Sequence, residues 1–278
     1  MNIGIVGLGL IGGSLGLDLR ACGHHVIGVS RRASTIETAV AIGSVDSSSV
    51  DINILGTAEV VFICTPLGLI VPTIEQLITV LPKSTVLTDV GSVKAPIVGA
   101  ASSLWQNFVG GHPMAGTADS GIEAALQNLF VHKPYVLTPT SDTPASAIEV
   151  VSELVKQLNS NIYYCEPEQH DRAVSWISHL PVMVSASLIG SCMEEKDNKV
   201  LQLAQNLASS GFKDTSRVGG GNPELGVMMA KYNREALLKS MHQYRHKFDE
   251  IINLIEQENW DNLENILKSN QQRRLDFL

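Results

Sequence analysis

A glycine-rich segment directly after the first apolar run constrains the fold of this chain more than any other feature. The run Ile3–Val6 predicts a short β-strand, and the next six residues are Gly7, Leu8, Gly9, Leu10, Ile11 and Gly12. A helical pattern then continues to about Arg20. In this context a G-x-G-x-x-G segment predicts the first turn of a dinucleotide-binding βαβ unit. Gly7 permits the tight turn, Gly9 lets backbone N–H groups approach a pyrophosphate at the helix N-terminus, and Gly12 allows close helix–strand packing.

The rest of the first half alternates short apolar strands with helical stretches. The predicted strands span residues 26–29, 60–64, 86–89, 107–109, 135–138 and 162–164. They are nearly continuous apolar runs, which is typical of strands covered by helices on both faces. Thr143 and Pro144 predict the start of a helix that runs to about Asn159, with threonine as N-cap. We therefore predict an α/β Rossmann-type N-terminal domain over residues 1–165.

The strand signals stop after Glu166 and Pro167, and the remaining sequence is helical in pattern. The predicted helices span roughly 168–195, 197–210, 223–258 and 260–276. The longest one opens at Asn222-Pro223-Glu224, which offers a cap, a proline and an early acid. We predict an all-helical C-terminal domain over residues 166–278. Its apolar helices are too long to be covered by their own chain, which favours a homodimer.

Charge and cysteine usage narrow the class of protein. The net charge of −8 argues against nucleic acid or an anionic membrane as the main partner. Residues 173–193 carry no formal charge, but they hold five serines, His179 and Pro181, so we predict a buried helix and no membrane span. No basic segment precedes an apolar run, so no secretory signal is expected. Four scattered cysteines without a C-x-x-C pair fit a cytoplasmic protein and indicate no metal site.

The end of the second strand bears on the choice of cofactor. Ser30, Arg31 and Arg32 follow Val29 directly. Proteins specific for NAD usually place an acid there to bind the ribose 2′-hydroxyl. Arginine instead matches the geometry of a 2′-phosphate, so we predict NADP as cofactor. The alternative is that the two arginines form a solvated surface pair.

Two further strand ends are expected at the same edge of the sheet. Thr65 and Pro66 follow one strand, and Gly91 and Ser92 follow another, within the segment 89–94. Ligands of doubly wound sheets lie at this edge, so these residues are predicted to contact the cofactor. Lys94 is a candidate for the nicotinamide side of the cleft, and a solvated loop lysine is an equally good interpretation.

A single histidine stands in the glycine-rich stretch Gly110–Gly116. His112 follows the predicted strand at 107–109 and is expected on a loop, where no regular element buries the imidazole. The unperturbed pKa of histidine, about 6.5, suits proton transfer near neutral pH. His112 is therefore the candidate general base of the site.

These motifs together resemble the prephenate/arogenate dehydrogenases (the TyrA family). The resemblance rests on the glycine turn, on Asp89–Lys94 (DVGSVK) and on Gly111–Gly116 (GHPMAG). Two later segments support it, Ser178–Pro181 (SHLP) and Gly211–Val218 (GFKDTSRV). The matching blocks cover nearly the whole chain in the same order, so the resemblance is specific.

The resemblance implies an oxidative decarboxylation of a cyclohexadiene that bears a 4-hydroxyl group and a ring carboxylate. Neutral His112 would accept the hydroxyl proton while hydride leaves for the nicotinamide, and Ser92 would hydrogen-bond His112 and orient it. Arg217 would bind a substrate carboxylate; its alternative is an ion pair with Asp214. His179 would line the same pocket, although a histidine on an apolar helix is as often a core group. Gly116 and Thr117 are expected to contact the substrate as well.

Two positions depart from the family pattern and bear on the substrate. Ala118 stands where many relatives have glutamate, and Gly226 stands where prephenate-specific relatives often have tryptophan. Relatives with this domain pair that use NADP often take L-arogenate. The resemblance therefore favours arogenate as substrate, with prephenate or dual specificity as the alternative.

Two other classes of protein remain open at this stage. A different hydroxyacid dehydrogenase would use a lysine of the helical domain as base, yet Lys196, Lys213 and Lys231 lie in no recognisable motif. An NADP-sensing protein would need the nucleotide turn but neither His112 nor Arg217.

Overall fold

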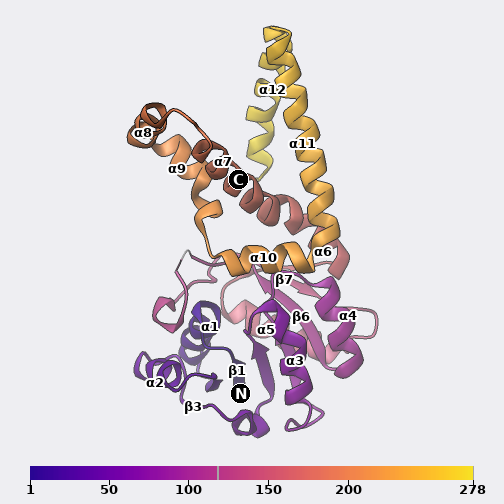
Figure 1. The fold of residues 1–278 in the computed structure, drawn as a ribbon. Helices are drawn as coiled ribbons and strands as arrows, with labels where there is room; N and C mark the ends of the chain where they lie inside the picture. Colours follow the sequence, from indigo (N-terminus) through magenta and orange to yellow (C-terminus); the bar gives the residue numbers. More distant parts are fainter. Residues whose placement is uncertain (118, 278) are drawn as a thin grey trace.

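The computed structural model describes residues 1–117 and 119–277, and it has two parts (Figure 1). An eight-stranded sheet flanked by helices forms the N-terminal part, and helices alone form the C-terminal part. The predicted fold class, a Rossmann-type domain followed by a helical domain, is confirmed. Ala118 lies outside the described residues.

The sheet has the strand order β3-β2-β1-β4-β5-β6-β7-β8. Neighbouring strands from β3 to β6 are parallel, β7 is antiparallel to β6, and β8 is parallel to β7. The strands are β1 (Asn2–Val6), β2 (His25–Val29), β3 (Ser47–Ser49), β4 (Val60–Ile63), β5 (Val86–Asp89), β6 (Phe108–Pro113), β7 (Pro134–Thr138) and β8 (Asn161–Tyr164). The order of the strands reverses at β1, with β2 and β3 on one side of it and β4 on the other, which makes the carboxyl edge beside β1 the expected place for a ligand.

Helices cover both faces of the sheet and then continue alone. Those of the N-terminal domain are α1 (Leu10–Ala21), α2 (Ala33–Ala41), α3 (Leu67–Leu77), α4 (Ala95–Leu104) and α5 (Ala145–Gln157). Those of the helical domain are α6 (Pro167–Val174), α7 (Leu180–Met193), α8 (Asn198–Leu207), α9 (Ser210–Ser216), α10 (Pro223–Tyr232), α11 (Arg234–Glu256) and α12 (Trp260–Arg273). A π-helical turn, η3 (Ser175–His179), joins α6 to α7, and a 3₁₀ turn, η4 (Arg217–Gly220), follows α9.

The core of the N-terminal domain consists of two apolar clusters, one on each face of the sheet. Leu15 and Leu19 of α1 pack with Val151 and Leu154 of α5 in the first cluster. Side chains of α3 and α4, among them Ile70, form the second cluster. Each fully buried aliphatic side chain contributes roughly 1.5–3 kcal/mol to folding. This two-sided burial explains why the strands are apolar throughout and do not alternate.

The helical domain rests on the N-terminal domain through α10, which lies across it (Figure 1). Met228 and Tyr232 of α10 pack against the apolar cluster on the α3 side of the sheet. The two helices also approach closely at Gly68 of α3, where an added Cβ atom would lie 2.8 Å from the Tyr232 hydroxyl oxygen. Helices α11 and α12 then project away from the sheet as a hairpin (Figure 1).

The prediction that His112 lies on a loop is wrong. Strand β6 continues through residues 108–113, because β7 pairs with it, and His112 lies opposite Val136. A Cβ atom at Gly110 would lie 2.4 Å from Thr138 Oγ1, and one at Gly111 would lie 2.7 Å from the Asp89 carbonyl oxygen. The two glycines are therefore needed for the close approach of β6 to Thr138 of β7 and to Asp89 of β5.

The predicted helices of the C-terminal half differ from the structure in two places. The helix expected over 223–258 is divided at Asn233, whose backbone leaves the helical region and whose side chain is buried. Helix α9 follows α8 and was not predicted, because Ser209 and Gly211 interrupt the pattern. In the first half, α5 begins at Ala145, and the Thr143 hydroxyl accepts a hydrogen bond from the Thr140 N–H group instead of capping the helix.

The glycines of the first turn have different steric surroundings. Gly7 has φ +99°, which favours glycine. A Cβ atom at Gly12 would lie 2.0 Å from the Gly7 carbonyl oxygen, whereas one at Gly9 would meet nothing within 4 Å. Gly9 has φ −100°, which other residues adopt readily.

We expect the substitution Gly12→Ala to destabilise the ligand-free protein by roughly 1–3 kcal/mol, because α1 must move away from the turn. Gly9→Ala is the matched control and is expected to leave the free energy of unfolding nearly unchanged. Urea denaturation of both variants and the wild type measures this difference. Equal stability of the two variants would contradict the steric assignment.

Candidate active site

The carboxyl edge of the parallel strands gathers the residues that were predicted to bind a cofactor. Gly7 follows β1, Ser30 follows β2, Thr65 follows β4 and Gly91 follows β5. These four strands are neighbours in the sheet, so the four positions line one edge. Ser30 and Thr65 are half-buried, whereas Pro66 is exposed at the start of α3.

The N-terminus of α1 has the properties of a phosphate-binding turn. Gly9 is its N-cap and supplies no side-chain hydrogen bond to the first turn. The Gly13 N–H group donates to the Gly9 carbonyl oxygen at 2.8 Å, which is the first hydrogen bond of the helix. The backbone N–H groups between Gly9 and Gly13 have no partner within the helix, so they are the donors for a ligand. Since no side chain occupies the space over Gly9, these residues fit the pyrophosphate of a dinucleotide.

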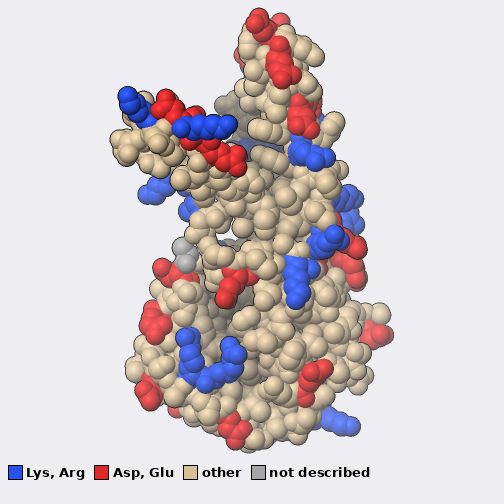
Figure 2. Space-filling model, in the orientation of Figure 1, with Lys and Arg blue, Asp and Glu red and all other residues tan. Residues whose placement is uncertain are grey.

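Arg31 and Arg32 are exposed beside this turn. Within residues 1–117 and 119–277 neither guanidinium forms an ion pair. Arg32 is the N-cap residue of α2, and Figure 2 shows basic side chains on the surface near α2. Exposure of both residues agrees with the 2′-phosphate site and with the predicted alternative, a solvated surface pair.

A buried ion pair holds the inner end of the site in place. Lys94 and Asp89 are both fully buried and form a salt bridge with each other. The Lys94 ammonium group also donates to the Gly111 carbonyl oxygen at 2.7 Å, and the Gly111 N–H group donates to Asp89 Oδ1 at 3.1 Å. Burial lowers the pKa of Lys94 below its usual value, and Asp89 opposes that shift. Lys94 is therefore neither a solvated loop residue nor exposed to the cleft, and it fixes β6 to β5.

His112 is the first member of a buried hydrogen-bonded chain that crosses between the two domains. Its Nδ1 atom lies 2.8 Å from His170 Nε2, and the two rings meet edge to face with centroids 5.0 Å apart. His170 Nδ1 lies 2.8 Å from Asp171 Oδ1. The exposed fractions of His112, His170 and Asp171 are 8%, 2% and 5%.

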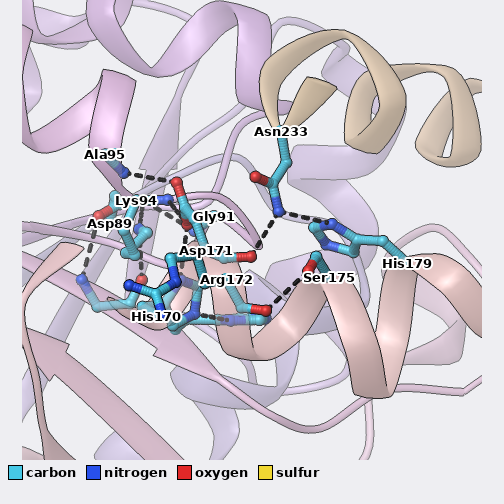
Figure 3. A network of polar contacts seen from close by, with 12 residues as sticks. Asp89, Gly91, Lys94, Ala95, His170, Asp171, Arg172, Ser175, His179 and Asn233 are labelled. Carbon is cyan, nitrogen blue, oxygen red and sulfur yellow. Dashed lines mark hydrogen bonds and ion pairs between the residues drawn. The ribbon is translucent and has the colours of Figure 1, made fainter. Parts of the chain in front are cut away.

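Asp171 belongs to the helical domain but caps a helix of the N-terminal domain. Its Oδ1 atom accepts a hydrogen bond from the Lys94 N–H group at 2.6 Å, and its Oδ2 atom accepts one from the Ala95 N–H group at 2.9 Å. These donors open α4, where the helix dipole favours a negative charge. Figure 3 shows the Asp171 carboxylate between Ala95 and His170.

His179 and Asn233 form the other side of the same network (Figure 3). The Asn233 amide donates to the Asp171 carbonyl oxygen at 2.7 Å and to His179 Nδ1 at 3.1 Å. His179 Nε2 is buried and has no hydrogen-bond partner in the part of the chain that the structure describes. The two hydrogen bonds of the Asn233 amide explain why the helix predicted over 223–258 is interrupted at Asn233. The asparagine side chain must turn inward to reach both acceptors.

Burial keeps the two site histidines neutral. It holds the pKa of His112 well below 6.5, and the neighbouring His170, Lys94 and His179 lower it further. The pKa of His179 falls to about 4, mainly through burial, while Asp171 opposes the shift. At pH 7 both rings are therefore uncharged, and a neutral imidazole can accept a proton.

The remaining predicted residues lie around this network without joining it. Ser92 does not hydrogen-bond His112 in the structure: its buried Oγ atom has no partner among the described residues, and His170 occupies that role. Arg217 is exposed on η4 and forms no ion pair with Asp214. Gly116 and Thr117 are exposed beyond β6. The surface is hollowed where the two domains meet (Figure 2).

His170, Asp171 and Asn233 were not predicted from the sequence as site residues. Helix α6 begins with a capping box between Glu166 and Gln169, which orients its first turns. Pro167, His170, Asp171 and Val174 then share its buried face. Two polar residues on an otherwise apolar helical face were the available signal, because buried polar side chains need partners.

The helical run 167–193 is long and apolar enough to cross a membrane by length and composition alone. It is nevertheless divided by the π-helical turn, and its first half carries the buried His170 and Asp171 that contact the N-terminal domain. This use in a site between two domains agrees with the prediction that the segment is not a membrane span.

Comparison with known proteins gives one family for both halves of the chain. Residues 15–164 match "Prephenate dehydrogenase, nucleotide-binding domain", and residues 166–269 match "Prephenate dehydrogenase, dimerization domain". The prephenate dehydrogenase of Bacillus subtilis (strain 168) is 33% identical over 267 residues, which are 93% of this chain and 71% of that protein.

Two solved structures cover the whole chain. The crystal structure of Synechocystis arogenate dehydrogenase is 54% identical, with a TM-score of 0.89 and full coverage of both chains. The prephenate dehydrogenase from A. aeolicus, in complex with hydroxyphenyl propionate and NAD+, is 28% identical, with a TM-score of 0.94 over 100% of this chain and 98% of that one.

Proposed function

We propose that this chain, which belongs to the prephenate dehydrogenase family, is an NADP-dependent arogenate dehydrogenase that forms L-tyrosine. At the coarser level it is an oxidoreductase of the prephenate/arogenate dehydrogenase family with a nucleotide-binding domain. The observation that carries the proposal is a neutral, buried His112 at the end of β6, beside the strand edge that carries the phosphate-binding turn.

The proposed cofactor site uses the chain's own backbone and basic side chains. The glycine turn would hold the pyrophosphate, and Arg31 with Arg32 would hold a 2′-phosphate, which an acid at this position would repel. The bound nicotinamide supplies a hydride acceptor. The nicotinamide would be bordered by the residues that follow the central strands β5 and β4, which are Gly91, Ser92, Thr65 and Pro66.

The proposed chemistry requires one proton acceptor. Hydride leaves C4 of the substrate with two electrons, and neutral His112 takes the proton of the 4-hydroxyl group as the carbonyl forms. The bond from C1 to the carboxylate then breaks, CO₂ leaves, and its electron pair makes the ring aromatic. The proton returns from His112 to the phenolic oxygen, so the reaction consumes and releases no proton overall.

Substrate binding is assigned to groups around His112. Arg217 would bind a carboxylate of the substrate, and its exposure without an ion pair to Asp214 leaves its guanidinium available for that role. His179, Gly116 and Thr117 would line the pocket, and a buried, unpartnered Nε2 atom on His179 suits a polar ligand. The 54% identity to a Synechocystis arogenate dehydrogenase supports arogenate over prephenate.

We also propose a cytoplasmic homodimer formed through the helical domain. Large apolar side chains are exposed there, including Trp176, Leu203, Tyr244 and Phe248. A second copy packed on these helices would remove that surface from water. The match to a dimerization domain supports this assembly.

The substrate and cofactor assignments are tested by one assay of reduced cofactor formation. The wild-type protein is offered arogenate and prephenate, each with NAD and with NADP. We expect the highest kcat/KM with arogenate and NADP. A higher value with prephenate would replace the substrate assignment by the alternative, a prephenate or dual-specificity dehydrogenase.

The cofactor assignment makes a separate prediction for Arg31. We expect Arg31→Ala to weaken NADP binding at least about tenfold while NAD binding changes little, because the lost contact is a charge-assisted one to phosphate worth roughly 1.5–3 kcal/mol. Titration of both cofactors measures the two affinities, and Lys83→Ala, at an exposed lysine distant in sequence, is the control. Equal losses for both cofactors would refute the 2′-phosphate assignment.

The role of His112 is tested by His112→Asn. We expect kcat to fall by about 10²–10⁴-fold, since a general base is removed, while NADP affinity is retained. Because the pKa of His112 lies well below 6.5, the wild-type rate should remain constant from pH 7.5 down to 6.5 and fall only at lower pH, where the ring gains a proton. Unchanged turnover in the variant would exclude the mechanism.

A further inference from the structure

We propose that His170 and Asp171 are positioning residues that hold His112 in the tautomer with its proton on Nδ1 and a free lone pair on Nε2. This inference rests on the proposed role of His112 as proton acceptor and deepens it. The observation behind it is the continuous chain of hydrogen bonds from the Asp171 carboxylate through His170 to His112.

The direction of each hydrogen bond in the chain follows from one fixed end. An ionised carboxylate can only accept, so His170 Nδ1 must carry the proton that it shares with Asp171. In the uncharged form of an imidazole, the other ring nitrogen, here Nε2, carries a lone pair. Since His112 Nδ1 lies 2.8 Å from that atom, the proton between them belongs to His112. His112 Nε2 is left unprotonated, as a proton acceptor requires.

The Asp171 carboxylate is itself held in one orientation. Its two oxygens accept from the Lys94 and Ala95 N–H groups at the start of α4, in addition to His170 Nδ1. Rotation of the carboxylate would break both backbone contacts and leave buried donors without partners, at a cost of roughly 1–3 kcal/mol each. The N–H groups at the start of α4 also attract the carboxylate oxygens, because they lie at the positive end of the helix dipole.

The charged and titratable groups that face His112 act in the same direction. Lys94 on the N-terminal domain and His170 and His179 on the helical domain all disfavour a positive charge on its ring. Asp89 pairs with Lys94, and Asp171 is separated from His112 by His170. The network therefore orients a neutral imidazole, and neither carboxylate contacts the His112 ring directly.

The chain also couples the chemistry to the contact between domains. His170 and Asp171 lie on α6 of the helical domain, whereas His112 lies on β6 and the capped helix α4 belongs to the N-terminal domain. The required tautomer is thus specified only while α6 is docked against α4. Without the contact to His170, this network would not select one tautomer of His112, since a neutral imidazole can carry its proton on either nitrogen.

A pair of substitutions at His170 separates positioning from packing. In His170→Gln the amide N–H can donate to Asp171 and the amide oxygen can accept from His112 Nδ1, so we expect kcat within about tenfold of wild type. His170→Leu has a similar size but no acceptor, and we expect kcat to fall about 10²–10³-fold with KM changed little. Equal kcat values in the two variants would overturn the proposal.

A direct measurement on the wild-type protein does not depend on how the variants fold. Long-range ¹H–¹⁵N spectra of protein labelled at histidine distinguish a protonated from an unprotonated ring nitrogen, and His112→Asn identifies the signals of His112. We expect a protonated Nδ1 and an unprotonated Nε2 at pH 7. The opposite pattern would overturn the proposal.

The double substitution distinguishes failure of this proposal from failure of the proposed function. If His170 acts through His112, His170→Leu should lower kcat no further in a His112→Asn background. If His112→Asn keeps full turnover, the proposed function fails. If His112→Asn is inactive while His170→Leu is fully active, only the positioning role fails.

Discussion

The carboxylate of Asp171 is the contact on which the arrangement of the site depends. It accepts three hydrogen bonds, two from the start of α4 and one from His170, and so joins a helix of one domain to a side chain of the other. All three donors are buried or nearly so, and a buried donor left without a partner is costly. The position of α6, and with it that of His170 and η3, therefore follows from satisfying this one acid.

The Asp89–Lys94 pair has the same function inside the N-terminal domain. A fully buried ion pair contributes little net stability compared with apolar side chains, but breaking it by removing one partner costs roughly 3–5 kcal/mol. Here the pair also binds both backbone groups of Gly111, the residue before His112. The pair thus fixes the position of His112 along β6, while His170 fixes the orientation of its ring. The protein uses buried charge to place an imidazole.

Predictions from the sequence were correct for features that depend on residues close together in the chain. The glycine turn occurs between β1 and α1, and Gly7 and Gly12 have the tight surroundings that the motif requires. His112 was singled out from its neighbours in the sequence, and it lies in the network that crosses between the domains. The prediction failed for its backbone, because pairing between β6 and β7 depends on residues 134–138, which lie far along the chain. It also failed for its hydrogen-bond partner, because His170 is distant in sequence from Ser92 and from His112.

The sequence by itself determined the fold class, the glycine turn and the choice of His112 as the candidate proton acceptor, because these follow from local periodicity and from residue chemistry. Only the tertiary structure decided which side chain holds His112, why the helix after Pro223 ends at Asn233, and that Lys94 lies in the core. Those outcomes depend on pairing buried donors with buried acceptors across two domains. Such pairing leaves almost no trace in local sequence, since a buried histidine or asparagine can be satisfied by a partner at any distance along the chain.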